Sequence, residues 1–162
     1  MLFRSTFSDA HFNLALVYEA EGRIGEAEAC YRQAVETDSE NLKAHLNLGN
    51  LLFQREEFGS ALKCYDTVLA LAPADPLAHK NRSRALRAMN SSEESLEAVA
   101  RAVELRPDDA LFQLEYGNAL REDGHPEKAA QHFLIAERLE PDNISILCNL
   151  GGILKEIGRA HV

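Results

Sequence analysis

Apolar residues recur along the chain at the spacing of amphipathic helices. Residues 42–75 contain two such sets: Leu48, Leu51 and Leu52, then Ala61, Leu62, Tyr65, Val68 and Leu69. Residues three and four apart share one face of a helix, so each set predicts a helix with one buried side. The pattern breaks near residues 56–58. This stretch is therefore predicted to form two helices joined by a short turn.

The two-helix pattern returns every 34 residues without insertion. Four full units span residues 8–41, 42–75, 76–109 and 110–143, and a fifth unit begins at Ile144. A fixed period of this kind indicates stacked repeats. We expect an all-α fold in which each full unit supplies two helices of about 12–14 residues. The incomplete fifth unit, residues 144–162, is expected to add one more helix, which makes nine.

The residue types at the expected helix ends support these boundaries. Glycine tolerates the left-handed backbone that ends a helix, whereas proline stops one. Aspartate and asparagine are preferred N-caps, and proline suits the first helical turn. The residues concerned are Gly22 and Gly124 at breaks, Pro73, Pro107 and Pro141 after second helices, Asp75, Asp109 and Asn143 as caps, and Pro126 in a first turn.

Small residues occupy positions 8 and 20 of each full unit, counted from the first residue of the unit. Two helices that face each other through small side chains can approach to about 8–10 Å between axes. We therefore expect these positions to be in contact within each unit. The pairs are Ala15 with Ala27, Gly49 with Ala61, Ser83 with Ser95, and Gly117 with Ala129.

These features resemble the tetratricopeptide repeat family. The resemblance rests on NLGN at 47–50, on the glycine turns, and on alanine, an aromatic residue and proline at positions 20, 24 and 32, and it covers residues 8–158. It implies a right-handed superhelical solenoid whose first helices line a concave groove. The departures are Ser39, Glu56, Arg82, Asn90 and Val99. Three of them lie in residues 76–109, so this unit is expected to be the most divergent.

Composition excludes several classes of function. A net charge of −9 and a pI near 5.1 argue against a general binder of nucleic acid or anionic membranes, which needs a basic surface. No apolar run reaches the roughly 20 residues of a membrane span. The three cysteines include Cys30 and Cys64, which recur one repeat apart and are therefore expected to lie too far apart for a disulfide. These observations predict a cytoplasmic protein with packing cysteines.

Neither a catalytic motif nor a metal-binding motif is present in the sequence. GxxxxGK[ST], GxSxG, HExxH and GxGxxG do not occur. His11, His45 and His79 share position 4, but residues one repeat apart cannot approach one ion to about 2.1 Å. We therefore expect a protein that is not an enzyme and that has no metal or cofactor.

Asparagine recurs at the positions that the resemblance places in the groove. Its amide both donates and accepts hydrogen bonds, as the backbone of an extended peptide does, and asparagine is only a moderate helix former. The column resembles the asparagine ladder of O-linked N-acetylglucosamine transferase-like proteins, which grips peptide backbone. The alternative is that these amides only cap or bridge neighbouring helices. The residues are Asn13, Asn47, Asn81 and Asn149 at position 6, with Asn50 and Asn118 at position 9.

Residues 77–89 concentrate positive charge, with four basic residues and no acid. This segment contributes +4, so the remainder of a chain with net charge −9 sums to −13. Lys80, Arg84 and Arg87 fall at groove positions, and Arg121 extends the patch from the next unit. The pattern predicts an acidic or phosphorylated ligand at this unit. The alternative is that these cations offset acidic neighbours, including Glu115 and Glu122. Arg82, at a packing position, is expected to meet a carboxylate or reach the solvent.

Three classes of function remain open. The first, which the groove favours, is a protein-interaction scaffold that binds an extended acidic peptide. The second is the recognition arm of a larger glycosyltransferase- or sulfotransferase-type enzyme, and the third is a self-assembling array. Binding of chaperone C-terminal tails is not expected. The carboxylate clamp of chaperone-adaptor repeats has lysine, lysine and arginine where this chain has Leu46, Leu111 and Glu115.

The two ends of the chain also carry expectations. Residues 1–7 align with the tail of a second helix and are interpreted as a lead-in from an upstream repeat. The last six residues, IGRAHV, match the translation of a common sequencing adapter and are expected to be artefactual, although Gly158 also fits the repeat. The last helix is expected to expose an apolar stripe that favours self-association. This stripe consists of Leu147, Leu150, Leu154 and Ile157.

Overall fold

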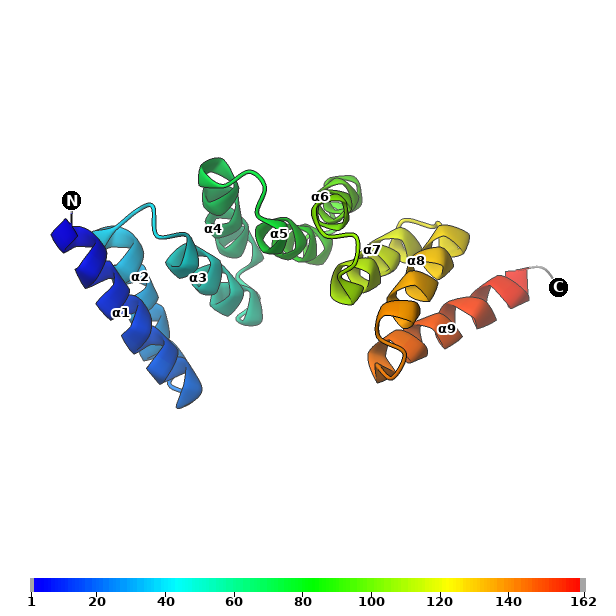
Figure 1. The fold of residues 1–162 in the computed structure, drawn as a ribbon, viewed down its shortest axis with the longest axis horizontal. Helices are drawn as coiled ribbons and strands as arrows, with labels where there is room; N and C mark the ends of the chain where they lie inside the picture. Colours follow the sequence, from blue (N-terminus) through cyan, green and yellow to red (C-terminus); the bar gives the residue numbers. More distant parts are fainter. Residues whose placement is uncertain (1, 161–162) are drawn as a thin grey trace. The chain divides into compact units, whose positions relative to one another are not determined.

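The computed structural model describes residues 2–160, with side chains from residue 6 to residue 159. Within residues 2–160 the chain forms nine α-helices and no strand, so the predicted all-α fold is confirmed (Figure 1). The helices are α1 (Leu2–Ala20), α2 (Ile24–Thr37), α3 (Leu42–Gln54), α4 (Phe58–Leu71), α5 (Pro76–Ala88), α6 (Ser92–Leu105), α7 (Ala110–Glu122), α8 (Pro126–Leu139) and α9 (Ile144–Ala160).

The helix boundaries follow the repeat closely. Helices α3, α5 and α7 each cover positions 1–13 of their unit, and α2, α4, α6 and α8 each cover positions 17–30. Helices α1 and α9 exceed the predicted length, with 19 and 17 residues. Residues 2–7 are continuous with α1, because no helix-breaking residue separates them from it, so they do not form the tail of a separate helix. Residues 161–162 of the expected artefactual end lie outside the described residues.

The chain divides into two compact units, one up to Ala78 and the other from His79 on. In the first unit α1 packs on α2, α2 on α3 and α3 on α4, as Figure 1 shows from blue to green. Small residues, leucines of α3 and one tyrosine per repeat fill its interior. The fully buried side chains of this unit include Ala15, Ala27, Tyr31, Ala34, Ala44, Ala61, Tyr65 and Val68.

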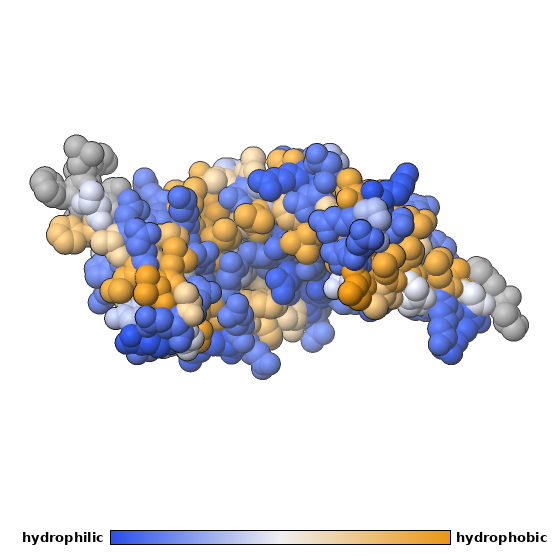
Figure 2. All heavy atoms as spheres, turned by 60° about the horizontal axis from the view of Figure 1, so that its bottom comes forward, coloured by the Kyte–Doolittle hydropathy of each residue, from blue (hydrophilic) through white to orange (hydrophobic). Residues whose placement is uncertain are grey.

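In the second unit α6 packs on α7, α7 on α8 and α8 on α9. Its core is a cluster of apolar residues: Ala110, Leu114, Leu120, Ala129, Ala130, Phe133, Ala136, Ile146 and Ile153. Leu150 and Ile157 of α9 are half-buried against this cluster, so the stripe that the sequence predicts is narrower than expected. The large apolar side chains that α9 exposes are those of Ile144, Leu147 and Leu154, and hydrophobic atoms gather over this end of the molecule in Figure 2.

Position 15 has a left-handed backbone in all four full units. The values of φ are 73° at Gly22, 62° at Glu56, 61° at Asn90 and 81° at Gly124. In the first repeat the turn closes with a hydrogen bond of 2.8 Å from the amide of Arg23 to the carbonyl of Tyr18. The turn geometry is therefore the same whether or not glycine is present, and Glu56 and Asn90 adopt a conformation that L-residues disfavour.

The predicted caps are confirmed. The Asp75 carboxylate accepts a hydrogen bond from the amide of Ala78, at 2.8 Å, and Asp109 accepts from the amides of Leu111 and Phe112. Asn143 accepts from the amides of Ser145 and Ile146 in the same way. These contacts satisfy amides that the first turn of a helix leaves unpaired.

The small residues at positions 8 and 20 are buried, and in the second and fourth repeats the aromatic residue at position 24 lies close to the glycine at position 8. A Cβ atom on Gly49 would lie 2.6 Å from the ring of Tyr65, and one on Gly117 would lie 2.4 Å from the ring of Phe133. In the other two repeats position 8 carries a side chain: Ala15 is buried in the unit that has Tyr31, and Ser83 is buried in the unit in which Val99 replaces the aromatic residue.

The serines at positions 8 and 20 of the third repeat are hydrogen-bonded to each other. The Oγ atoms of Ser83 and Ser95 lie 2.9 Å apart, and the Ser95 hydroxyl also donates to the carbonyl of Ser83 at 3.0 Å. Both residues are almost completely buried. Polarity as well as size therefore matters at this contact, which joins α5 to α6.

Candidate functional site

An open pocket of about 390 Å³ lies between α1 and α3 in the first unit. Leu16, Glu19 and Ala20 of α1 and Asn47 and Asn50 of α3 line it. These residues occupy positions 9, 12 and 13 of one repeat and 6 and 9 of the next, and the family resemblance assigns positions 6, 9 and 12 to the groove. The pocket therefore combines a carboxylate and two amides with an apolar wall.

A buried tyrosine of α2 holds two of the polar groups that line this pocket. The Tyr31 hydroxyl donates a hydrogen bond to Oε2 of Glu19, at 2.7 Å, and the Asn47 amide nitrogen lies 3.4 Å from the same hydroxyl oxygen. Because the phenol proton is used for Glu19, Asn47 must donate to the phenol oxygen, and this fixes its amide orientation. Burial, and then the bond to Glu19, raise the pKa of Tyr31 above its ordinary value.

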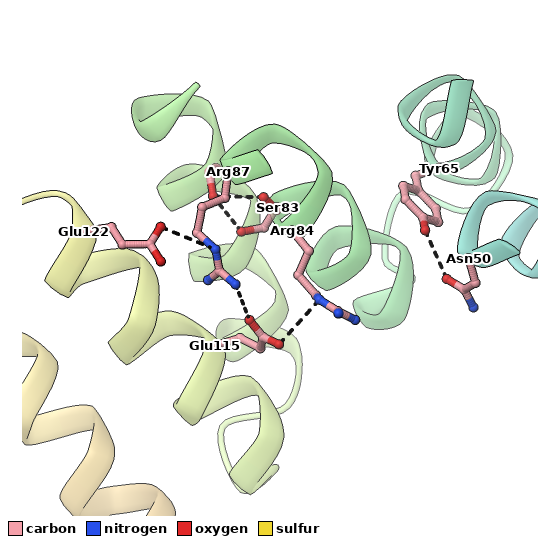
Figure 3. A network of polar contacts seen from close by, with 8 residues as sticks. Asn50, Tyr65, Ser83, Arg84, Arg87, Glu115 and Glu122 are labelled. Atoms are coloured by element: carbon pink, nitrogen blue, oxygen red, sulfur yellow. Dashed lines mark hydrogen bonds and ion pairs between the residues drawn. The ribbon is translucent and has the colours of Figure 1, made fainter. Parts of the chain in front are cut away.

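The second asparagine of the pocket is held in a similar manner. The Tyr65 hydroxyl donates to Oδ1 of Asn50 at 3.1 Å (Figure 3). Tyr31 and Tyr65 both occupy position 24 and are almost completely buried. Asn47 and Asn50 thus do bridge first and second helices, which is the alternative that the sequence leaves open for the asparagine column. Their positions remain on the pocket, so bridging and ligand binding do not exclude each other.

In the second unit a half-buried carboxylate of α7 joins two arginines of α5 (Figure 3). Glu115 Oε1 lies 3.6 Å from Nε of Arg84, and Oε2 lies 3.2 Å from Nη2 of Arg87. Arg87 also lies 3.4 Å from Glu122. These ion pairs agree with the alternative stated for residues 77–89, in which the cations offset acidic neighbours. Arg84 remains the more accessible cation, with 40% of its side chain exposed against 24% for Arg87.

Two other residues predicted at the groove of this unit are buried. Lys80 is 9% exposed, and Asn81 is 7% exposed. Burial lowers the pKa of Lys80. Position 5 of α5 is therefore a packing position here, and the expectation that Lys80 belongs to an accessible basic patch is wrong. Arg121 is half-buried in the last turn of α7.

The remaining predicted residues have varied surroundings. Asn13 is exposed on α1, and Asn149 donates to the carbonyl of Ser145 in its own helix at 2.8 Å. Asn118 is half-buried, and its Oδ1 accepts no hydrogen bond from the described residues. Position 6 therefore does not present one uniform ladder of amides. Glu19 and the two tyrosine hydroxyls were not predicted as site residues, although an acid at position 12 and tyrosine at position 24 are visible in the sequence.

A second pocket, of about 470 Å³, lies on α5 and α6 within the second unit. Its lining mixes both signs of charge and consists of His79, Arg82, Glu97, Ala98, Ala100, Arg101 and Glu104. Arg82 is half-buried, and Glu97 and Glu104 line the same pocket. Arg101 pairs with Glu104 at 2.7 Å.

The acidic residues, histidines and cysteines give no sign of a metal site among the described side chains. Among the described side chains, no group of three or more histidine, cysteine, aspartate or glutamate residues could hold a metal ion. Cys30 is buried and Cys64 is half-buried, but Cys148 is exposed, so it is not the packing residue that the sequence predicts. No helix in the described part of the chain has the length and apolar character that crossing a membrane requires.

The sequence model of the tetratricopeptide repeat matches residues 12–76 and 80–144. No curated protein matches the chain. Three solved structures are similar in fold: Pseudomonas aeruginosa pilF (TM-score 0.84, 22% identity, covering 96% of this chain and 71% of that one); YrrB, a TPR protein with an unusual peptide-binding site (0.75, 21%, 91% and 76%); and the first TPR of Spaghetti bound to the HSP90 peptide SRMEEVD (0.70, 21%, 75% and 96%). These similarities establish the fold class, an all-α helical repeat solenoid.

Proposed function

The chain belongs to the tetratricopeptide repeat family, and on this basis we propose that it is a non-catalytic protein-interaction scaffold that binds an extended peptide. The observation that carries the proposal is the pocket between α1 and α3, in which buried tyrosines hold Asn47 and Asn50. Two of the similar structures, YrrB and the first TPR of Spaghetti, are described with a peptide-binding site or a bound peptide. Their likeness in fold supports a peptide as the ligand class.

Preorganisation supports this proposal in physical terms. A side chain that is already fixed loses little conformational entropy when it binds a ligand, so more of each new hydrogen bond contributes to affinity. Asn47 is fixed because its amide nitrogen donates to Tyr31, and its amide oxygen accepts no hydrogen bond from the described residues. The amide oxygen is therefore suited to a peptide N–H.

We further propose that the ligand carries an acidic side chain where it passes Arg84. The side chain of Arg84 is 40% exposed and lies 3.6 Å from Glu115, a longer separation than the 3.2 Å between Glu115 and Arg87. A ligand carboxylate or phosphate would have to compete with Glu115 for this guanidinium. Arg121 is the second cation in this part of the proposal.

Selection of phage-displayed random peptides on the full chain tests the peptide-binding function. We expect a related family of peptides to be enriched. In fluorescence anisotropy, Asn47→Ala should weaken an enriched peptide by about 1 kcal/mol, roughly fivefold, for the loss of one hydrogen bond. Gln33→Ala, which removes an exposed amide from α2, is the matched control and should leave the affinity unchanged. The absence of any enriched family would contradict the peptide-binding function.

The acidic part of the proposal has a separate measurement. Arg84→Gln should weaken enriched peptides that contain aspartate or glutamate, and it should have little effect on the same peptides with asparagine or glutamine at those positions. Raising the ionic strength should reduce the difference. Equal binding of both peptide versions would refute an acidic preference and leave the scaffold function standing.

Self-association is a second candidate, favoured by the exposed Ile144, Leu147 and Leu154 of α9. Apolar side chains on one helix face commonly mark an interaction surface. Sedimentation equilibrium of the chain and of the double variant Leu147→Glu with Leu154→Glu tests this candidate. A concentration-dependent mass that the double variant abolishes would support it, whereas a constant monomer mass would exclude it.

A further inference from the structure

We propose that the pocket between α1 and α3 binds a basic side chain, lysine or arginine, with Glu19 as its counter-ion. The inference rests on the proposed function in so far as this side chain belongs to the bound peptide. It concerns the first unit, whereas the acidic preference proposed above concerns Arg84 in the second. The peptide that fits both statements has charges of both signs.

The Glu19 carboxylate has few partners within the protein. It is half-buried and receives one neutral hydrogen bond, from Tyr31, on Oε2. Its other oxygen accepts no hydrogen bond from the described residues, and no basic side chain among them lies within ion-pair distance of it. A carboxylate has about four acceptor sites, so Glu19 keeps most of its capacity for a cationic donor.

Three of the six basic residues in residues 1–78 pair with other acids. Arg23 pairs with Glu21 and Glu26 at 3.1 and 3.0 Å. Arg32 and Arg55 both reach Glu28. None of these three arginines lines the pocket, and none of the ion pairs among the described residues involves Glu19.

The rest of the pocket lining is apolar or carries amides. Leu16 and Ala20 offer apolar surface in the same pocket as the carboxylate, and Leu16 is 40% exposed. Lysine and arginine have aliphatic stems that pack on such surface while the charged head reaches an acceptor. The Asn47 oxygen, which its bond to Tyr31 leaves available, supplies a second acceptor. The pocket therefore matches both the stem and the head of a basic side chain.

The unit that contains the pocket has the more negative net charge of the two. Residues 1–78 contain twelve acidic and six basic residues, a net charge of −6. Residues 79–162 contain fourteen acidic and eleven basic residues, a net charge of −3. The potential around the first unit therefore attracts cations more strongly, and such a field raises association rates at low salt.

A small-molecule titration tests the pocket without assuming any peptide ligand. The probe is N-acetyl-arginine methylamide, compared with the citrulline compound, which has nearly the same shape but no charge. In ¹H–¹⁵N spectra of the full chain, the arginine compound should shift the side-chain amide of Asn47 and the backbone amides near Leu16 and Glu19. The citrulline compound should shift them much less. Equal shifts with the two compounds would overturn the inference.

Variants assign the effect to the carboxylate. Glu19→Gln keeps an oxygen that can accept from Tyr31 but removes the charge, so it should abolish the arginine-specific shifts. Glu36→Gln makes the same charge change on the exposed side of α2 and should retain them. Retention of the shifts in Glu19→Gln would contradict the proposal. A far-UV spectrum equal to that of the parent chain confirms that the variant is folded.

The peptide selection separates failure of this inference from failure of the scaffold function. On the parent chain we expect lysine or arginine at one position of the enriched peptides, and on Glu19→Gln we expect that preference to disappear. Affinity of a basic peptide should fall at least about tenfold in Glu19→Gln, as for the loss of one charge-assisted hydrogen bond. Enriched peptides without a basic position would refute the inference alone, whereas no enriched peptides would refute the scaffold function.

Discussion

Glu19 in the first unit and Glu115 in the second are both half-buried carboxylates on first helices, yet their partners differ. Glu19 receives a neutral hydrogen bond from the phenol of Tyr31. Glu115 lies between the guanidinium groups of Arg84 and Arg87, and its side chain is only 14% exposed. One carboxylate therefore has a neutral partner, while the other lies between two cations of the protein. The comparison shows that the surroundings of an acid on a first helix depend on the side chains that neighbouring helices bring to it.

Among the predicted effects on stability, substitution of the glycine at position 8 should have the largest. It tests the packing of this position against the aromatic ring at position 24 in each of the two units. Gly117→Ala places a Cβ atom 2.4 Å from Phe133, and Gly49→Ala places one 2.6 Å from Tyr65. We expect each to lower stability by about 1–3 kcal/mol, as overpacking does. Urea unfolding followed by circular dichroism measures the change.

Two further variants control this prediction. Gly151→Ala, at a glycine of α9 with open space around it, should raise stability by about 0.5–1 kcal/mol. Adding Phe133→Val to Gly117→Ala imitates the small neighbour of Ser83 and should give a double variant less destabilised than the sum of the single changes. Additive effects would show that the ring at position 24 does not set the limit.

The two carboxylate networks should differ in their response to salt. Tyr31→Phe removes the hydroxyl that serves Glu19 and Asn47 and should lower stability by about 1–2 kcal/mol, nearly independent of salt. Glu115→Gln should cost about 0.5–1 kcal/mol at low salt and less at high salt, since partly exposed ion pairs are screened. Unfolding midpoints at low and high sodium chloride measure both. A strong salt response of Tyr31→Phe would remove the distinction between the networks.

The turns provide a smaller comparison between the units. Glu56 and Asn90 have positive φ at the position that holds glycine in the other two full repeats. Glu56→Gly should stabilise by about 1 kcal/mol and Asn90→Gly by about 0.5 kcal/mol, because asparagine tolerates the left-handed region better than glutamate. The reverse change, Gly124→Ala, should destabilise by a similar amount. Thermal midpoints provide the measurement, and a loss of stability in Glu56→Gly would contradict the strain argument.

The smallest expected effect is on pH dependence. Burial lowers the pKa of His132, whose Nδ1 lies 2.8 Å from Oε1 of Gln113. The native state therefore favours the neutral ring, so this contribution is present above the ordinary pKa of about 6.5 and is lost as pH falls below it. The unfolding midpoint should decrease from pH 7 to pH 5, less so in His132→Gln. Identical slopes in the two proteins would contradict it.

Tyr31 should give the first unit a pH dependence on the alkaline side. Its pKa is raised, first by burial, so the contribution of the protonated phenol is present below the ordinary value of about 10 and is lost as pH rises above it. Stability should therefore fall on the alkaline side, and Tyr31→Phe should reduce that dependence. Unfolding midpoints between pH 8 and pH 11 measure it, and an unchanged slope in the variant would count against the burial of this proton.

The sequence alone determined the repeat length, the helix boundaries, the turns and the caps. These features depend on residues close together in the chain. Apolar spacing defines one face of a helix, Asp109 or Asn143 satisfies amides two or three residues further on, and Gly124 relieves a single backbone position. The period of 34 residues then repeats the same local solution, which is why α3, α5 and α7 have identical bounds within their units.

The tertiary structure alone decided which of the predicted site residues line a pocket and which are buried or paired within the protein. Position 6 holds asparagine at residues 47 and 81 alike, but Asn47 lines a pocket and Asn81 is buried. The sequence predicts that Lys80 and Arg84 both lie in the groove, but Lys80 is buried and Arg84 is accessible. The reason is that burial and ion pairing depend on side chains from other helices, about 30 residues away in sequence, as for Arg87 and Glu115 with their separation of 28. A periodic pattern specifies the side of a helix, and the neighbouring helix specifies what that side contacts.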